Sequence, residues 1–316
     1  MDRAADETQE FETDMSSPRK LVVVVPAYNE GKGIGATIDG LHSIKDTLAG
    51  MGWTLAVYVV DDGSKDDTRQ RAAAAERVLI HRVNQGLGAA VRTGLAAARA
   101  DGADIAVKFD ADLQHEPADI PALMEPILSD QADVVYGNRF ERIDYRMPPM
   151  RRVGNFLFTR LMGWLTGWPL RDSQPGIFAV NRGYLEVFML PGDYNYTQQV
   201  LLDAYHNGMR FAHVPVAFHK RTTGKSFVSL KYPFKVLPQI MMVIVGIRPM
   251  RVFVPIGTVL LVTAGAFFVY ELAQHFRGIN PKPIQHVNLV LGLSFFGLQT
   301  FFFGILAELI VRGQRK

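Results

Sequence analysis

The segment FDADLQHEP, residues 109–117, places oxygen-bearing side chains directly after an apolar run. Asp110 and Asp112 alternate along the chain, so on an extended strand end both carboxylates would point the same way, toward one divalent cation or toward a cation and a ligand hydroxyl. Gln114 has the same parity and can add an amide oxygen, and such hard ligands suit Mg²⁺ or Mn²⁺ bound jointly with a diphosphate. His115 is expected to play a supporting role. The simpler alternative, an N-cap for the next helix, needs only one aspartate.

Three further polar clusters follow apolar runs, namely PAYNE at 26–30, DDGS at 61–64 and GNR at 137–139. Asp61 and Asp62 stand where a carboxylate can accept a hydrogen bond from a base N–H or a ribose hydroxyl, and Glu30 is placed for ribose contact. An Asp-Gly turn before a capped helix would explain DDGS without any ligand. The four clusters together exceed what loop polarity requires, so they predict a nucleotide-type site.

Apolar runs and helical stretches alternate along this part of the chain and predict a doubly wound α/β sheet. The predicted strands are 21–25, 55–60, 78–82, 105–109 and 133–137. The predicted helices are 34–49, 67–76, 87–100 and 118–128. Ligands of such sheets bind beyond the carboxyl ends of the strands, and all four polar clusters fall there.

Two apolar runs without charged residues, 252–270 and 287–307, follow near the C-terminus. As helices they would reach about 28 to 32 Å, which matches a hydrocarbon core of about 30 Å. Basic residues flank the pair on both outer sides, at Lys231, Lys235, Arg248, Arg251, Arg312, Arg315 and Lys316. The positive-inside rule therefore predicts a transmembrane hairpin with both flanks in the cytosol. The alternative is a pair of buried core helices.

Composition narrows the classes of protein further. The chain of 316 residues has no cysteine, which excludes disulfides, cysteine metal sites and thiol nucleophiles. A net charge of +3 and a basic region beside the apolar runs favour contact with anionic lipid over nucleic acid. The acidic residues 1–18 lack an apolar stretch, so a disordered tail is expected in place of a signal peptide.

The motifs VVVPAYNE, VVDDGSKDDT, NQGLGAAVRTG and FDADLQHEP, in this order and spacing, closely resemble family 2 glycosyltransferases of the GT-A fold. VVYGNRF, RRVGNFLFTRLMG, LRDSQPGIFAVNR and FHKRTTGKSF, followed by a membrane hairpin, resemble the polyprenyl-phosphate hexosyltransferases within that family. This group includes dolichyl-phosphate mannosyltransferase and bacterial undecaprenyl-phosphate glucosyltransferases. One segment departs from the group, because related chains often read D-P-T-S-G-F where residues 172–177 read DSQPGI.

The resemblance implies roles for individual residues. Asp61, Asp62, Pro26, Tyr28 and Glu30 would hold the nucleoside. Asp110, Asp112 and Gln114 would manage the metal, the diphosphate and the donor sugar, and Arg139 with Arg151 or Arg152 would face the acceptor phosphate. Uridine and guanosine both offer an N–H to a carboxylate, so the donor stays open between a UDP-sugar and a GDP-sugar, and the sugar stays open as well.

The chemistry of a lipid phosphate acceptor favours the same function. A lipid phosphate monoester has a second pKa of about 6, so it is already an ionised nucleophile at neutral pH and needs no strong base. The site must instead neutralise two anionic groups, which calls for a metal and for basic side chains. Arg139, Arg151, Arg152, Arg221 and Lys225 fit this demand, although a basic patch beside a membrane can also bind headgroups. The basic and aromatic stretch 151–168 is either an interfacial helix or an ordinary core helix.

These observations predict an acidic tail (1–18), a cytosolic GT-A domain (19–230), an interfacial segment (231–250), a transmembrane hairpin (251–312) and a short tail (313–316). The predicted function is inverting transfer of a hexose from a nucleotide diphosphate sugar to a polyprenyl phosphate. The resemblance also implies a homo-oligomer, a tetramer in related enzymes. The two alternatives are a processive polysaccharide synthase, which usually carries a Q-x-x-R-W motif that this chain lacks, and a non-catalytic membrane scaffold.

Overall fold

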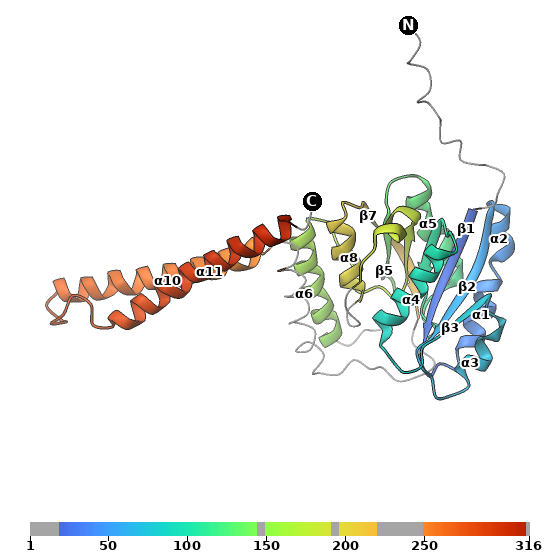
Figure 1. The fold of residues 1–316 in the computed structure, drawn as a ribbon, viewed down its shortest axis with the longest axis horizontal. Coiled ribbons are helices and arrows are strands. Elements are labelled where there is room, and N and C mark those ends of the chain that lie inside the picture. Colours follow the sequence, from blue (N-terminus) through green and yellow to red (C-terminus); the bar gives the residue numbers. More distant parts are fainter. Residues whose placement is uncertain (1–18, 144–148, 191–195, 220–244, 246–248, 314–316) are drawn as a thin grey trace, which may run out of the picture. The chain divides into compact units, whose positions relative to one another are not determined.

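The structure, a computed structural model, describes residues 19–143, 149–190, 196–219, 245 and 249–313 (Figure 1). The chain divides into two units, Met1–Phe227 and Val228–Lys316. Arg221 and Lys225, both predicted to contact the acceptor phosphate, lie outside the described residues, as does nearly all of the predicted interfacial segment 231–250.

The first unit is built on a mixed sheet whose described strands run in the order β3-β2-β1-β4-β6-β5-β7. The strands are β1 Arg19–Ala27, β2 Trp53–Asp61, β3 Arg77–Ile80, β4 Ile105–Lys108, β5 Val134–Ile143, β6 Phe178–Asn181 and β7 Phe211–Phe218. β6 is antiparallel to both of its neighbours, and every other neighbouring pair is parallel. The carboxyl ends of all strands except β6 therefore meet at one edge of the sheet.

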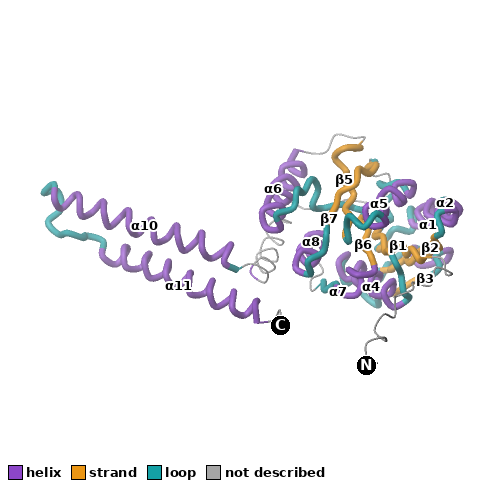
Figure 2. Tube along the Cα trace, turned by 90° about the horizontal axis from the view of Figure 1, so that it is seen from above, coloured by secondary structure: helices purple, strands orange, loops and turns teal. Residues whose placement is uncertain are grey.

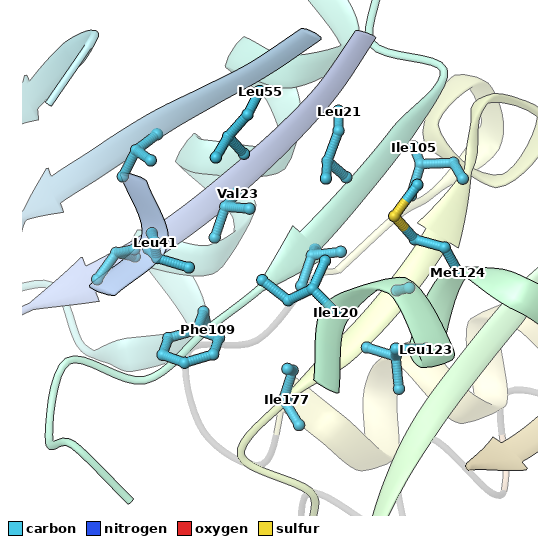
Figure 3. Close-up of a cluster of buried hydrophobic side chains, with 14 of the residues drawn as sticks. Leu21, Val23, Leu41, Leu55, Ile105, Phe109, Ile120, Leu123, Met124 and Ile177 are labelled. Carbon is cyan, nitrogen blue, oxygen red and sulfur yellow. The ribbon is translucent and has the colours of Figure 1, made fainter. Parts of the chain in front are cut away.

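Helices cover both faces of this sheet (Figure 2). They are α1 Ile34–His42, α2 Lys45–Gly50, α3 Thr68–Arg71, α4 Leu87–Ala100, α5 Ile120–Leu128, α6 Pro149–Thr166, α7 Arg182–Val187 and α8 Tyr196–His206, with short 3₁₀ turns η1 Ala72–Ala74 and η2 Pro117–Asp119. On one face, α1 and α5 bury Leu41 and Ile120 against alternate side chains such as Val23 of β1 (Figure 3). On the other face, Gly94 of α4 packs on Val24.

The fold confirms the predicted α/β class and places a strand at each of the five predicted positions. The prediction that residues 137–139 follow a strand was wrong, because β5 continues through them and pairs with β7 as far as Ile143. The predicted helix 34–49 is two helices, since the chain leaves helical geometry at Ile44, where φ is −95° and ψ is 2°. The strands β6 and β7 were not predicted.

The second unit contains two long apolar helices, α10 Met250–Phe276 and α11 Val287–Gly313. Both are long and apolar enough to cross a membrane, with mean hydropathies of 2.3 and 2.0. They pack closely because Gly257 and Gly297 face each other. A Cβ at Gly257 would lie 3.0 Å from the carbonyl oxygen of Gly297 and 2.8 Å from the ring of Phe301. Small residues at such crossings are typical of helices that associate in lipid.

Glu271 fastens the connection between α10 and α11. Its buried carboxylate accepts hydrogen bonds from the backbone N–H of Gln285 at 2.8 Å and of His286 at 3.1 Å, and it lies 2.5 Å from Nδ1 of the His286 ring. The carboxylate thus satisfies backbone donors at the start of α11, where a negative charge is favoured.

Replacing Glu271 with glutamine is expected to loosen this connection, because hydrogen bonds to a charged group contribute about 1.5–3 kcal/mol each. Trypsin cleavage after Arg277 in detergent should become at least about tenfold faster, since proteolysis follows the population of the open form. Fragment masses give the rate, and Glu308→Gln, in α11 and outside the connection, is the matched control. Equal rates for the variant and the wild type would contradict this role.

Candidate active site

The loops that follow β1 and β2 are joined by hydrogen bonds into one surface. The backbone N–H of Asn29 donates to Oγ of Ser64 at 2.9 Å, and the N–H of Lys65 donates to Oδ1 of Asn29 at 2.9 Å. The N–H of Glu30 donates to Oγ1 of Thr68 at 2.9 Å. Asn29 adopts a φ of 55°, a left-handed conformation that asparagine tolerates better than most residues. The PAYNE and DDGS motifs therefore form one preordered unit.

The predicted nucleoside residues gather on this surface. Pro26 was expected to end its strand, but it lies within β1 and pairs with Val60 of β2. Tyr28 and Glu30 follow as half-buried side chains. Asp61 is buried at the end of β2, and its Oδ1 accepts the N–H of Ser64 at 3.0 Å. The predicted contact of these residues with a nucleoside stays a prediction.

The Asp62 carboxylate forms hydrogen bonds with other groups of the protein. Its Oδ1 accepts the N–H of Gln85 at 2.9 Å, and its Oδ2 accepts the N–H of Gly86 at 2.8 Å. Nδ1 of His81 lies 2.7 Å from the same Oδ1, and Nε2 of His81 lies 2.9 Å from Oγ1 of Thr93. Asp62 therefore holds the loop between β3 and α4 beside the DDGS motif. Sequence reasoning missed His81, for which the only signal is a histidine at the end of an apolar run.

Replacing Asp62 with asparagine should lower the free energy of unfolding by about 2 kcal/mol, because an amide nitrogen would face a backbone N–H where an oxygen now accepts. Asp61→Asn is the matched comparison, since Asp61 accepts only the Ser64 N–H among the bonds described. The thermal midpoint of the full chain in detergent should fall further for Asp62→Asn than for Asp61→Asn. Equal midpoints would refute the holding role of Asp62.

The DADLQH motif is a turn, so the extended strand end from which a common direction of Asp110 and Asp112 was expected is not present. β4 ends at Lys108, the chain turns at Ala111 and Asp112, and Leu113 has a φ of 59°. The turn is nevertheless fixed to β1, whose C-terminal end leads into the PAYNE loop. The N–H of Phe109 donates to the carbonyl of Val24 at 2.9 Å.

Gln114 is held by the end of β7. Its Nε2 donates to the carbonyl oxygen of His219 at 2.8 Å, and its own carbonyl accepts the N–H of His219 at 2.8 Å. Because Nε2 must face that carbonyl, the amide oxygen of Gln114 is directed away from it. Nε2 of His219 lies 2.7 Å from Oε1 of Glu116. His219 is therefore bound to the DADLQH motif.

A buried basic residue, Lys108, adjoins this turn and was missed in the sequence. Its Nζ forms an ion pair with Asp110 and donates to the carbonyl of Gly176 at 2.8 Å. Burial alone would lower the pKa of Lys108, but the Asp110 carboxylate outweighs burial and raises the pKa above its usual range. The neighbouring His115 is neutral, because burial lowers its pKa to about 4, and its Nδ1 lies 3.2 Å from the carbonyl of Ala217.

Arg139 lies on β5 with its guanidinium paired to Asp172. Nε donates to Oδ2 at 2.7 Å and Nη2 donates to Oδ1 at 3.1 Å. Asp172 also accepts from Nδ2 of Asn155 in α6 at 3.1 Å. Burial would raise the pKa of Asp172, but the Arg139 charge and these hydrogen bonds hold it below the usual range. The paired guanidinium lies over the ring of Phe218, 5.0 Å from its centre.

The basic helix α6 has two distinct faces. Asn155, Thr159 and Met162 are buried, whereas a second set of side chains is exposed, namely Arg152, Val153, Phe156, Leu157, Arg160 and Trp164. Arg151 precedes Arg152 in the first turn. The helix is therefore neither wholly core nor wholly surface, and its predicted contact with lipid or with an acceptor phosphate stays a prediction.

The residues of the DADLQH motif fit a divalent cation by their chemistry. Two carboxylates and an amide oxygen are hard ligands, which Mg²⁺ and Mn²⁺ prefer, and both metals commonly share their coordination with a phosphate. Among the residues that the structure describes, no three His, Cys, Asp or Glu side chains gather as a metal cluster. Asp110 and Asp112 with Gln114 would therefore form a partial set that a diphosphate completes.

Comparison with known proteins gives the family of this α/β chain. Residues 22–188, more than half of the chain, match the sequence profile of glycosyl transferase family 2. The chain belongs to this family. It is related to sugar transferases that act with polyprenyl and dolichyl phosphates.

Two relatives illustrate this relation. A UDP-N-acetylglucosamine–dolichyl-phosphate N-acetylglucosaminyltransferase from Methanococcus voltae is 31% identical over 62% of this chain and 84% of its own. A dodecaprenyl-phosphate galacturonate synthase from Rhizobium johnstonii is 26% identical over 93% of this chain and 88% of its own.

Among solved structures, glucosyl-3-phosphoglycerate synthase from Mycobacterium tuberculosis is similar in fold. Its complex with Mn²⁺, uridine diphosphate and phosphoglyceric acid matches with a TM-score of 0.55 and 26% identity, over 71% of this chain and 77% of that chain. The same enzyme has also been solved with Mg²⁺ and uridine diphosphate.

Proposed function

We propose that this chain transfers a hexose, with inversion, from a UDP- or GDP-sugar to a polyprenyl phosphate at the cytosolic face of a membrane. The observation that carries the proposal is the arrangement at the carboxyl edge of the sheet. There the preordered loops after β1 and β2 adjoin the DADLQH turn on one side, and the Arg139–Asp172 pair lies on the other. The relatives, which use lipid phosphates, support the same acceptor class.

The donor half of the site would work by binding and orientation. Asp61 and the loops around Glu30 would hold the nucleoside. Asp110, Asp112 and Gln114 would hold Mg²⁺ or Mn²⁺, which when bound neutralises the diphosphate as it leaves. Because Asp110 is tethered to the buried Lys108, its carboxylate is set before the donor arrives. This preorganisation limits the reorganisation needed during transfer.

The acceptor half of the site would work by electrostatic attraction between basic side chains and the acceptor phosphate. The phosphate of the acceptor is ionised at neutral pH, so it can attack the sugar carbon directly, and a single displacement inverts that carbon. Arg139 would attract this phosphate while Asp172 fixes the orientation of its guanidinium. Arg151, Arg152, Arg221 and Lys225 would add positive charge. The hairpin of α10 and α11 would anchor the chain in the membrane that contains the acceptor.

The test is a donor screen with the full chain reconstituted in vesicles that contain polyprenyl phosphate. Radiolabelled UDP-glucose, UDP-galactose, UDP-N-acetylglucosamine and GDP-mannose are supplied with Mg²⁺ or Mn²⁺, and lipid-extractable label is measured. We expect one donor to label the lipid with inverted configuration and EDTA to stop the reaction. Label in a lipid-free polymer would favour a processive synthase, label on added 3-phosphoglycerate would favour a soluble acceptor, and binding of no donor would favour a scaffold.

A further inference from the structure

Lys108 is a charged residue in the interior of a strand, and the structure surrounds it completely. Its side chain is 0% exposed and projects from β4 on the face that α8 covers. Nζ lies 5.3 Å from the centre of the Tyr196 ring. A buried ammonium group is costly unless it is paired and hydrogen-bonded, and Lys108 meets both conditions through Asp110 and the Gly176 carbonyl.

The two partners of Lys108 belong to different halves of the proposed site. Asp110 is the first carboxylate of the DADLQH turn. Gly176 ends a short segment, residues 172–176, that begins with Asp172, the partner of Arg139. The same segment contains an internal hydrogen bond, in which the N–H of Gln174 donates to Oδ1 of Asp172 at 2.9 Å. A continuous set of contacts therefore runs from Asp110 through Lys108 and Gly176 to Asp172.

Gly176 also touches the metal motif directly. A Cβ at this position would lie 2.5 Å from Oδ2 of Asp110 and 2.3 Å from Nε2 of His115, so the backbone of the segment packs on both side chains. Lys108 holds one oxygen of the Asp110 carboxylate, and the Gly176 backbone confines the other. The orientation of this carboxylate is thereby determined by groups that are not themselves metal ligands.

We infer that Lys108 is a positioning residue, which fixes the Asp110 carboxylate for a divalent cation and ties it to the segment 172–176 that holds Arg139. This inference rests on the proposed function, because it assigns Asp110 to the donor metal. A lysine suits the task because its three N–H donors can serve a carboxylate and a carbonyl at once. Methionine would keep much of the apolar stem and would remove both bonds.

The test measures metal binding as well as activity. Mn²⁺ is titrated into the detergent-solubilised full chain in the presence of UDP, and in parallel GDP, and free Mn²⁺ is followed by electron paramagnetic resonance. Changes to groups that orient a metal ligand commonly weaken affinity by about 10- to 100-fold, and Lys108→Met should weaken Mn²⁺ binding by this factor. Binding of the nucleotide without metal should be unchanged, because the hydrogen bonds and the ion pair described for Lys108 are made with Asp110 and Gly176 and not with the loops after β1 and β2.

A double variant separates positioning from general damage. If Lys108 acts through Asp110, then Asp110→Asn already removes what Lys108→Met would remove, and the double variant should bind Mn²⁺ as Asp110→Asn does. The double variant leaves no buried charge unpaired, so this comparison remains available if Lys108→Met alone does not fold. Wild-type Mn²⁺ affinity in Lys108→Met, or a double variant that loses the product of both single effects, would overturn the inference.

Two outcomes distinguish this inference from the proposed function. A wild type that binds Mn²⁺ with UDP or GDP but transfers no sugar to polyprenyl phosphate would refute the proposed acceptor and leave the role of Lys108 standing on the binding data. A wild type that binds Mn²⁺ with neither nucleotide would refute the donor site and the role of Lys108 with it.

Discussion

Replacement of Asp112 with asparagine should reduce sugar transfer at least about 100-fold, because loss of a proposed metal ligand should cost no less than loss of a group that only orients one. The change keeps the size of the side chain and removes its negative charge. The N–H of Gln114 donates to Oδ1 of Asp112 at 3.2 Å, and an asparagine oxygen can still accept this bond. The turn should therefore survive while the affinity for Mg²⁺ or Mn²⁺ falls.

The measurement is the rate of lipid labelling across a Mn²⁺ titration. We expect Asp112→Asn to need more Mn²⁺ and to have a lower rate at saturation, with an unchanged thermal midpoint in detergent. Asp46→Asn in α2 is the matched control, because it removes an exposed carboxylate from a helix that precedes the amino end of β2 and not from a loop at the carboxyl ends of the strands. Full activity in Asp112→Asn at the Mn²⁺ concentration that half-saturates the wild type would contradict the assignment of this residue.

The sheet was predictable where the chain forms continuous apolar strands. The buried parts of β1, β2 and β4 contain continuous apolar runs, at 21–25, 55–60 and 105–107, and the run in β4 ends at the buried Lys108. β6 was not predicted, although its length of four residues is the same as that of β3 and β4. β7 was not predicted because His213 and Pro215 interrupt its apolar pattern. The insertion of β6 between β4 and β5 depends on pairing between segments distant in sequence, such as Lys108 with Phe178. Local periodicity does not encode such pairing.

The site was predictable in its residue types but not in its contacts. The spacing of Asp110, Asp112 and Gln114 indicated a metal, yet it did not show that the chain turns after Lys108. Lys108 itself carried a signal, because a lysine inside a strand that should be buried needs a partner. One partner, Asp110, lies only two residues further along the chain. The other, Gly176, could not be identified from the sequence because it lies 68 residues further along.

The departure of DSQPGI from the related D-P-T-S-G-F pattern can now be interpreted from the structure. The two positions that agree, Asp172 and Gly176, are those that hold Arg139 and confine Asp110. Ser173 is buried beside Thr159 of α6, with the two hydroxyl oxygens 3.0 Å apart. Three of the four residues that differ, 173–175, therefore lie between Asp172 and Gly176, and the contacts that matter for the proposed mechanism are made by the residues that match.

Replacement of Gly176 with alanine tests the packing of residues 172–176 on Asp110 and His115. It adds one methyl group and should greatly reduce the rate of sugar transfer. The new Cβ would lie closer than 3.0 Å to both Asp110 and His115, so the segment or the Asp110 carboxylate must move. Neither neighbour can yield easily, because Asp110 is bound to Lys108, and Nδ1 of the buried His115 lies 3.2 Å from the Ala217 carbonyl. A displacement of about 1 Å at a catalytic group can cost about 100-fold in rate, and we expect a loss of this size.

The matched control is Gly35→Ala near the start of α1, where a Cβ would meet nothing within 4 Å. It should keep wild-type transfer and gain a little stability, since alanine favours a helix over glycine by about 1 kcal/mol. Gly176→Ala should lower the rate of transfer and the affinity for Mn²⁺ together, because the same methyl group displaces the Asp110 carboxylate, a proposed metal ligand, and the segment that orients Arg139. If Gly176→Ala slowed transfer while Mn²⁺ affinity stayed at the wild-type value, the methyl group would be acting on the acceptor half alone, and the confinement of Asp110 by Gly176 would be disproved.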